Sequence, residues 1–144
     1  MIYLLRFIIL FGVSATAAAL DTSDVGTYAI VHRDGHVTDS VFFASLTGAT
    51  WNVEESKSNG TWSSVTCERD CILRNSLQQD IVRFFPANFL TAATPTCVHN
   101  TAFAFCNYTL RSQPGTKAYI LIALVTPQPT PVNLRKLSGD RRGP

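Results

Sequence analysis

Three side chains with metal-binding chemistry lie close together near the start of the chain. His32, Asp34 and His36 surround the pair Asp34-Gly35, and imidazole and carboxylate groups are common ligands of divalent transition metals. An Asp-Gly pair is also a favoured hairpin turn, and turns collect polar residues for conformational reasons alone. Two interpretations follow: solvated turn residues, which the turn signal favours, or a metal site built from these three side chains.

Four cysteines offer either thiolate chemistry or disulfides: Cys67, Cys71, Cys97 and Cys106. Their spacings, C-x3-C and C-x8-C, differ from those of standard zinc sites. His99 lies between the last two cysteines, but a Cys–His nucleophile requires a free thiol. An even number of cysteines in an exported chain indicates two disulfides. Three pairings are possible, and the spacing favours the local pairs Cys67–Cys71 and Cys97–Cys106.

The expectation of export comes from the N-terminus. Arg6 is followed by an apolar run over residues 7–13 and by Ala17-Ala18-Ala19. This order, a basic residue, an apolar run and a small-residue cleavage site, is typical of a signal peptide. The run is shorter than the roughly 20 apolar residues that span a bilayer. We therefore predict a signal peptide at residues 1–19, a periplasmic or extracellular location and no transmembrane segment after cleavage. An uncleaved membrane anchor is the alternative.

Aromatic and acidic residues cluster around a second turn signal, Asn59-Gly60. Trp51 and Trp62 flank this turn, so a register that pairs them would stack the two indoles across the strands. Exposed, the same indoles would form a binding platform, but tryptophan is usually mostly buried, which favours a core role. Glu54 and Glu55 are adjacent, so a strand directs them to opposite faces and they cannot act together on one bond.

The elements that must position these residues follow from hydrophobic periodicity. Ser76 to Gln79 reads as a capping box, and the apolar spacing after it predicts one short helix over residues 77–85, which Pro86 ends. Alternating or continuous apolar runs predict six strands in three hairpins. The predicted strands are 26–31, 37–44, 50–54, 61–66, 102–111 and 119–125. The expected fold class is α+β and β-rich: an antiparallel sheet or a small open barrel with the helix packed on it.

The composition changes at residue 127. Three prolines alternate with other residues, and the basic side chains that follow outnumber a single Asp. Because proline cannot donate to a ladder and the segment has little apolar surface, we expect residues 127–144 to form a disordered basic tail. The globular, disulfide-stabilised domain is then expected over residues 20–126.

Two Asn-x-Thr sequences are potential acceptors of an N-linked glycan. Asn59 lies in a predicted turn, where a glycan has room. Asn107 lies in a predicted strand, which is a less suitable position. The sequence does not establish the source organism, and a bacterial source would remove both acceptors.

The charge balance and the motifs narrow the function. The net charge of +2 becomes +1 when Arg6 is removed, which is too close to neutral to indicate a nucleic-acid partner. The sequence predicts no cofactor. Our first expectation is an exported non-enzymatic protein, such as an inhibitor, immunity-type factor, effector or surface factor, that binds another protein. A small secreted hydrolase or metal-binding protein using His32, Asp34 and His36 is the alternative. The second alternative is a carrier of apolar ligands, its cavity lined by Phe42, Phe43, Phe103, Phe105 and Tyr119.

Overall fold

A computed structural model describes residues 18–65 and 67–141. Residues 1–17 of the predicted signal peptide lie outside the described residues. The described chain is rich in strands, with a 3-10 helix, η1, before the first strand and two short α-helices before the sixth. The order is η1 (Thr22–Asp24), β1 (Gly26–Val31), β2 (Val37–Thr47), β3 (Thr50–Ser56), β4 (Trp62–Ser64), β5 (Arg74–Asn75), α1 (Gln78–Phe84), α2 (Ala87–Ala92), β6 (Ala93–His99), β7 (Phe103–Leu110), β8 (Lys117–Ala123) and β9 (Thr130–Ser138).

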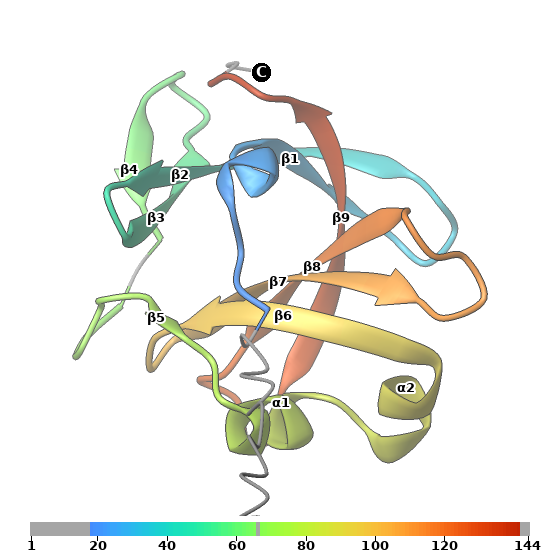
Figure 1. Ribbon diagram of the computed structural model, residues 1–144. Coiled ribbons are helices and arrows are strands. Elements are labelled where there is room, and N and C mark those ends of the chain that lie inside the picture. The colour runs from blue at the N-terminus through green and yellow to red at the C-terminus, as the bar shows by residue number, and fades with distance from the viewer. Residues whose placement is uncertain (1–17, 66, 142–144) are drawn as a thin grey trace, which may run out of the picture.

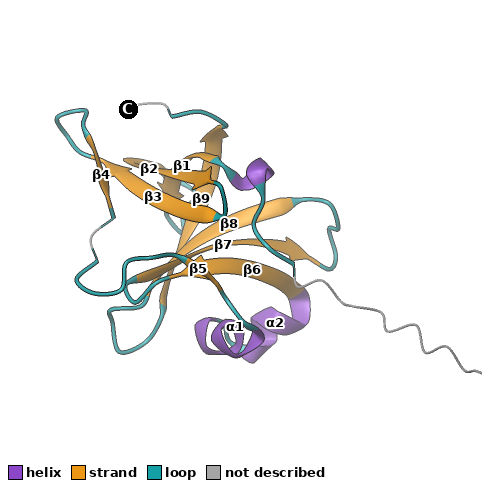
Figure 2. Cartoon of the chain, turned by 60° about the vertical axis from the view of Figure 1, so that its left-hand side comes forward, coloured by secondary structure: helices purple, strands orange, loops and turns teal. Residues whose placement is uncertain are grey.

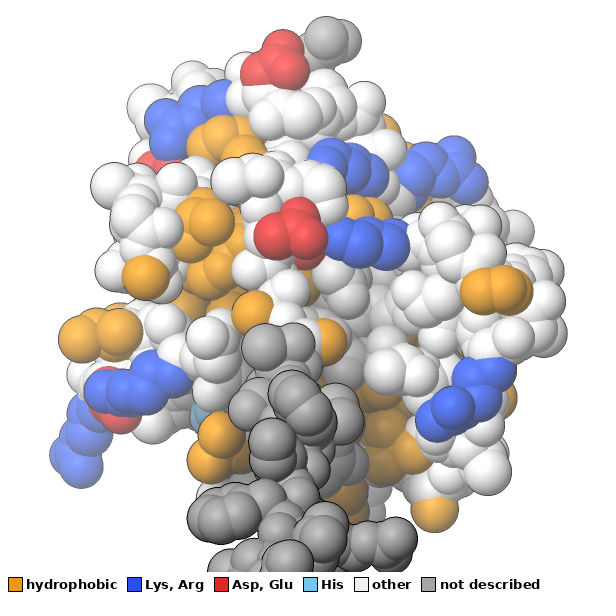
Figure 3. Space-filling view, in the orientation of Figure 1, with side chains coloured by type: hydrophobic (Ala, Val, Ile, Leu, Met, Phe, Trp, Pro, Cys, Tyr) orange, Lys and Arg blue, Asp and Glu red, His pale blue; other side chains and the backbone are white. Residues whose placement is uncertain are grey.

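All strands belong to one antiparallel sheet, in the order β4-β3-β2-β1-β9-β8-β7-β6-β5. The sheet curls into a half-barrel, so that β1–β4 form one layer and β5–β8 another, with β9 running between the two (Figures 1 and 2). A bridge between Trp51 in β3 and Leu73 before β5 joins the two ends of the sheet. On the face seen in Figure 3, a band of hydrophobic side chains lies between the two layers. The junction between β3 and the segment before β5 therefore combines apolar packing with backbone pairing.

The three predicted hairpins are confirmed: β1 pairs with β2, β3 with β4, and β7 with β8. The sheet has nine strands rather than the six predicted, because β5, β6 and β9 were not expected. The alternation within the hairpins is also as expected, because Phe103 and Phe105 face the inside of the curled sheet and join its core cluster. The turns differ from the expected type. In the first two hairpins only the glycine, Gly35 or Gly60, has a positive φ, whereas a two-residue Asp-Gly or Asn-Gly turn needs positive φ at both positions.

Aromatic rings fill the inside of the sheet. The ring of Tyr28, which is fully buried, lies 5.3 Å from that of Phe105 and 4.8 Å from that of Tyr119, measured between centroids. Trp51 packs against Phe105 at 6.2 Å. Ring separations of 4.5–7 Å are those of favourable aromatic pairs. The interior of the half-barrel is thus a packed core at this level.

The two helices cover the outer face of β6–β8. Ile81, Phe84 and Phe85 form a second core cluster with residues of these strands, and α1 and α2 lie against that side of the sheet in Figure 2. The predicted helix is confirmed as α1, but a second helix, α2, begins directly after Pro86 and was not predicted. The cap of α1 also differs from the predicted one. The Asp80 carboxylate accepts the Leu77 N–H at 2.8 Å, and the Ser76 hydroxyl bonds elsewhere.

The interpretation of residues 127–144 as a disordered tail is wrong for residues 130–138. They form β9, which pairs with both β1 and β8 in the middle of the sheet. Val132, Leu134 and Lys136 are the more buried residues of β9, and their neighbours are exposed. This alternation is the strand signal that the prolines conceal. Pro131 is tolerated because β9 pairs with β1 only from residue 133 onward, so the proline lies where the strand has one neighbour.

We predict that Leu134→Ala destabilises the protein strongly and Leu137→Ala does not. Leu134 is 8% exposed in the core, whereas Leu137, three residues later in the same strand, is 48% exposed. Truncating a buried leucine costs about 2–5 kcal/mol, and a surface change usually stays within about 0.5 kcal/mol. Urea unfolding of both variants measures the difference. Equal stability of the two variants would show that β9 does not contribute to the core.

Candidate binding surface

The predicted metal-ligating residues lie at the β1–β2 turn. The rings of His32 and His36 stack with centroids 6.3 Å apart and planes 7° apart. Asp34 accepts the His36 N–H at 2.9 Å, so its carboxylate is engaged in forming the turn. Within residues 18–65 and 67–141 no group of three or more His, Cys, Asp or Glu side chains is placed to hold a metal ion. The structure brings the two imidazoles together without a third ligand from Asp34.

The two tryptophans do not stack on each other, because the register does not pair them. The register pairs Trp62 with Ser56, which places Trp62 on the face opposite to Trp51. Trp51 is buried inside the sheet. Trp62 packs edge-on against Phe43 at 6.2 Å, and the Arg141 guanidinium lies 5.6 Å from its ring centroid. Part of the Trp62 ring is therefore covered by the chain itself, which leaves less of it to serve as a platform.

Both local cysteine pairs form disulfides, Cys67–Cys71 and Cys97–Cys106. Cys97 and Cys106 are directly opposite each other in β6 and β7, and both are buried beneath the helices. No free cysteine occurs in the described part of the chain, so neither a catalytic thiol nor a thiolate zinc site is available there. Two disulfides are compatible with an exported protein.

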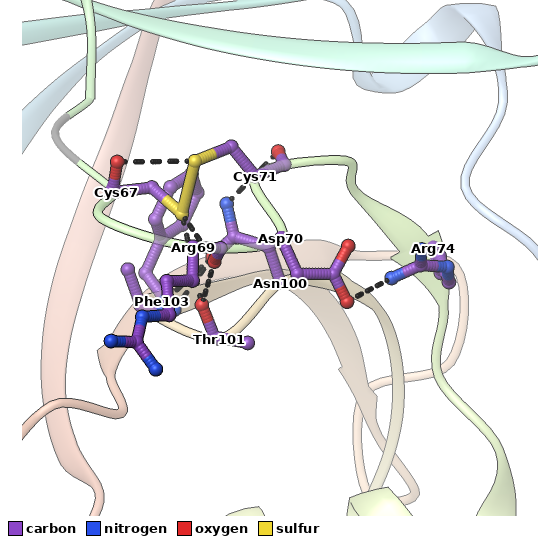
Figure 4. Close-up of a disulfide and its surroundings, with 9 residues drawn as sticks. Cys67, Arg69, Asp70, Cys71, Arg74, Asn100, Thr101 and Phe103 are labelled. Carbon is purple, nitrogen blue, oxygen red and sulfur yellow. Dashed lines mark hydrogen bonds and ion pairs between the residues drawn. A yellow bond between two sulfur atoms is a disulfide. The ribbon is translucent and has the colours of Figure 1, made fainter.

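The other disulfide closes an exposed loop that is fastened to the sheet at several points (Figure 4). The Asn100 side chain donates to the carbonyl oxygen of Cys71 at 3.2 Å, and the Thr101 hydroxyl donates to that of Arg69. Asn100 is itself buried and accepts the N–H groups of Ala102 and Phe103. The loop is thus held by one covalent bond and by hydrogen bonds to the β6–β7 turn.

An ion pair holds the far side of the same loop. Asp70 has a φ of +48°, a conformation that non-glycine residues seldom adopt. Arg74 donates to the Asp70 carboxylate at 2.7 Å, and this hydrogen bond lowers the pKa of Asp70 below its usual value. The Asp70 carboxylate is therefore charged at neutral pH, and it is paired with the Arg74 guanidinium.

A hollow of about 760 Å³ lies beside this loop. Its lining comprises Cys67, Glu68, Arg69, Thr101, Ala102 and Val125. A second depression shares Thr101 and continues past Leu124 to Pro127 and Pro129. Two apolar side chains nearby are largely in solvent, Val125 at 75% and Ile72 at 61% exposed. We refer to residues 67–72, 100–102 and 124–129 as the loop end.

A hydroxyl–imidazole pair lies near the start of α1, and the sequence did not indicate it. The Ser76 Oγ is 2.8 Å from His99 Nδ1, although the two residues are 23 positions apart. The His99 ring rests edge-on against Phe84, and burial lowers its pKa. Such pairs serve nucleophilic catalysis when a third group orients the imidazole. Here the pair links the segment after β5 to the end of β6, which is a structural role.

A buried carboxylate joins the N-terminal helix η1 to the sheet. Asp24 in η1 is fully buried, and its Oδ1 accepts hydrogen bonds from Asn107 at 2.9 Å, Lys117 at 3.0 Å and Tyr119 at 3.2 Å. The Tyr28 hydroxyl donates to the Asp24 carbonyl oxygen. The three side-chain donors to Oδ1 compensate the buried charge, which is the requirement for burying an ion. The cluster is therefore part of the framework.

No family model, curated protein or solved structure matches this chain. None of the helices in the described residues is long and apolar enough to cross a membrane. A fold alone does not determine function, so the function must be inferred from the chemistry and geometry of the surface. Of the regions described above, the loop end combines a rigid loop, a hollow and exposed apolar side chains without an evident structural role.

We expect mild reduction to open the Cys67–Cys71 disulfide before the Cys97–Cys106 disulfide. Thiol–disulfide exchange requires access of the attacking thiolate, and the first loop is exposed whereas Cys97 and Cys106 are 3% and 0% exposed. Alkylation followed by peptide mass spectrometry at increasing reductant concentration measures the order. Simultaneous opening of both disulfides would contradict the difference in burial.

We also expect alkaline pH to destabilise the protein through Tyr119. Burial, together with the nearby Asp24 charge, raises the pKa of Tyr119 to about 12, against about 10 in an unfolded chain. Between these values the unfolded chain loses a proton that folded Tyr119 retains, so the free energy of unfolding falls as pH rises. The same burial raises the pKa of Tyr28, which adds to the slope.

Urea unfolding at several pH values from 7 to the alkaline limit measures this slope. Tyr119→Phe should make the slope shallower, although the variant loses a hydrogen bond to Asp24 and is less stable at neutral pH. Tyr108→Phe is the control, since Tyr108 lies on the outer face against Phe89. An unchanged slope in Tyr119→Phe would show that Tyr119 is not linked to the alkaline transition.

Proposed function

We propose that the chain is an exported, non-enzymatic protein that binds another protein through the loop end. One observation carries the proposal: the Cys67–Cys71 loop is fixed by a disulfide and by Asn100 and Thr101, yet it borders a hollow and exposed apolar side chains. A loop held this firmly loses little conformational entropy when it binds. The rigid loop is thus already in a conformation suited to recognition.

The chemistry of the loop end suits a protein partner. Val125 and Ile72 expose apolar surface, and burying such a side chain contributes about 1.5–3 kcal/mol when it is fully removed from water. Arg69 lines the hollow beside them, and arginine is enriched among the residues that dominate protein interfaces. A centre of apolar contacts with a charged rim is the usual anatomy of such an interface.

Packing inside the sheet weighs against the carrier of apolar ligands. Of the residues expected to line a cavity, Phe103, Phe105 and Tyr119 are members of the interior cluster. Within it, Phe105 and Tyr119 pack against Tyr28 and each other. Phe43 lies instead on the outer face with Trp62. These positions fit a filled core, and the hollow at the loop end is open and bordered by charged residues. A small ligand usually needs 70–90% of its surface buried.

The proposal is tested by comparing aspartate substitutions at two largely exposed valines. Val125→Asp places a charge in the proposed interface, whereas Val82→Asp places one on α1, where Val82 is 58% exposed. Each protein is immobilised and exposed to the extracytoplasmic fraction of its source organism. Val125→Asp should reduce the captured partner at least about tenfold, which corresponds to about 1.4 kcal/mol, and Val82→Asp should leave it unchanged.

Three outcomes would overturn the proposal. Equal capture by both variants would mean that binding occurs away from the loop end. Loss of capture with Val82→Asp alone would place the interface on α1. The reproducible absence of any captured protein would argue against a protein partner altogether. Circular dichroism of both variants establishes that each one is folded before capture is compared.

A further inference from the structure

The β3–β4 turn presents an asparagine in a geometry suited to covalent modification. Gly60 has a φ of +79°, and the turn closes with hydrogen bonds from Gly60 N–H to Lys57 and from Lys57 N–H to Thr61, at 2.9 and 2.8 Å. The hairpin projects from the body of the protein in Figures 1 and 2. Asn59 is exposed at its tip. A bulky group attached there would extend into solvent.

The amide oxygen and the amide nitrogen of Asn59 have different surroundings. Its Oδ1 accepts hydrogen bonds from the Thr61 N–H at 3.0 Å and from the Thr61 hydroxyl at 2.6 Å. Across residues 18–65 and 67–141, no side-chain hydrogen bond involves its Nδ2. The Asn-x-Thr motif requires the hydroxyl of Thr61. This hydroxyl already donates a hydrogen bond to the amide oxygen of Asn59, and the amide nitrogen is available.

Asn107, the second asparagine with this motif, has the opposite surroundings. It is 7% exposed inside the sheet, and its Nδ2 donates to the buried Asp24 carboxylate at 2.9 Å. An attached glycan would replace one of the two Nδ2 hydrogens beside a buried charge and would need space that the packed core lacks. A chain modified at Asn107 would not reach the structure described above.

We propose that Asn59 is an N-linked glycosylation site and that Asn107 is not. The donor is an oligosaccharide linked through a diphosphate to a lipid. The Asn59 Nδ2 forms a bond to the anomeric carbon of the first sugar and loses a proton. The bond from that carbon to the diphosphate oxygen breaks, and the lipid diphosphate leaves with the electron pair. No oxidant or reductant is needed. The proposal depends on export through a route that contains this transferase, and not on the binding function of the loop end.

A pocket beside the turn provides room for the first sugar. It measures about 450 Å³ and is lined by Asp39, Ser40, Ser56, Lys57 and Ser58. These side chains offer hydroxyl, carboxylate and ammonium groups, which hydrogen-bond to sugar hydroxyls. The first sugar can therefore lie against β2 and β3 without displacing a buried side chain.

The test is expression of the full chain in a eukaryotic secretory host, with the protein collected from medium and cells together. Treatment with a peptide N-glycosidase should shift the wild-type protein to a lower mass and convert Asn59 to aspartate in the corresponding peptide. Asn59→Gln and Thr61→Ala should each abolish the shift. Thr61→Ser should retain it, because the hydroxyl is preserved.

The matched control is Thr109→Val, which removes the second motif while leaving Asn107 in place to bond Asp24. This variant should carry the same glycan as the wild-type protein. Absence of the mass shift in the wild-type protein, or a glycan found on Asn107 in folded protein, would overturn the assignment. Failure of partner capture at the loop end would leave this result unaffected, so the two proposals are tested separately.

Discussion

The buried carboxylate of Asp24 is the interaction that joins the N-terminal turn to both layers of the sheet, and much of the core depends on it. A charge that is fully removed from water must be compensated by hydrogen bonds and an opposite charge. Those partners come from β7 and β8, through Asn107, Lys117 and Tyr119, while the Asp24 backbone is bonded by Tyr28 of β1. The Asp24 charge is therefore fully compensated only when the N-terminal turn, both layers of the sheet and the aromatic interior have all formed. Removing one partner would leave an ion in the core with incomplete compensation.

The Asp24 cluster and the loop end are stabilised by different means. The first belongs to the framework of the fold, and the second is the candidate binding surface. Around Asp24, burial and hydrogen bonds determine the structure. At the loop end few buried apolar side chains are present, and the Cys67–Cys71 disulfide together with Asn100 holds the chain in place. A covalent bond fixes a loop without requiring apolar side chains to be buried beneath it. Ile72, next to the disulfide, can consequently remain in solvent.

Local patterns in the sequence were sufficient for some elements and insufficient for others. The hairpins at Asp34-Gly35 and Asn59-Gly60 were predictable because turn residues and alternation agree there, and the disulfides because nearby cysteines pair. β9 was missed because prolines concealed the alternation of Val132, Leu134 and Lys136. The Asp24 cluster and the Ser76–His99 pair join residues 83 and 23 positions apart, and no local pattern encodes such contacts. The loop end could likewise not be predicted from the sequence, because the exposure of Val125 depends on which residues the rest of the folded chain covers.

The position of β9 has a consequence for how the molecule is made. The strand that completes the middle of the sheet follows all the other described strands in the sequence, and its pairing with β1 joins residues more than a hundred positions apart, such as Thr27 and Ser138. Contacts between residues far apart in sequence form slowly because a long loop must close first. Until residues 130–138 are present, β1 and β8 have no strand between them and the two layers have no shared centre. The order of strands thus delays completion of the sheet until β9 has been made.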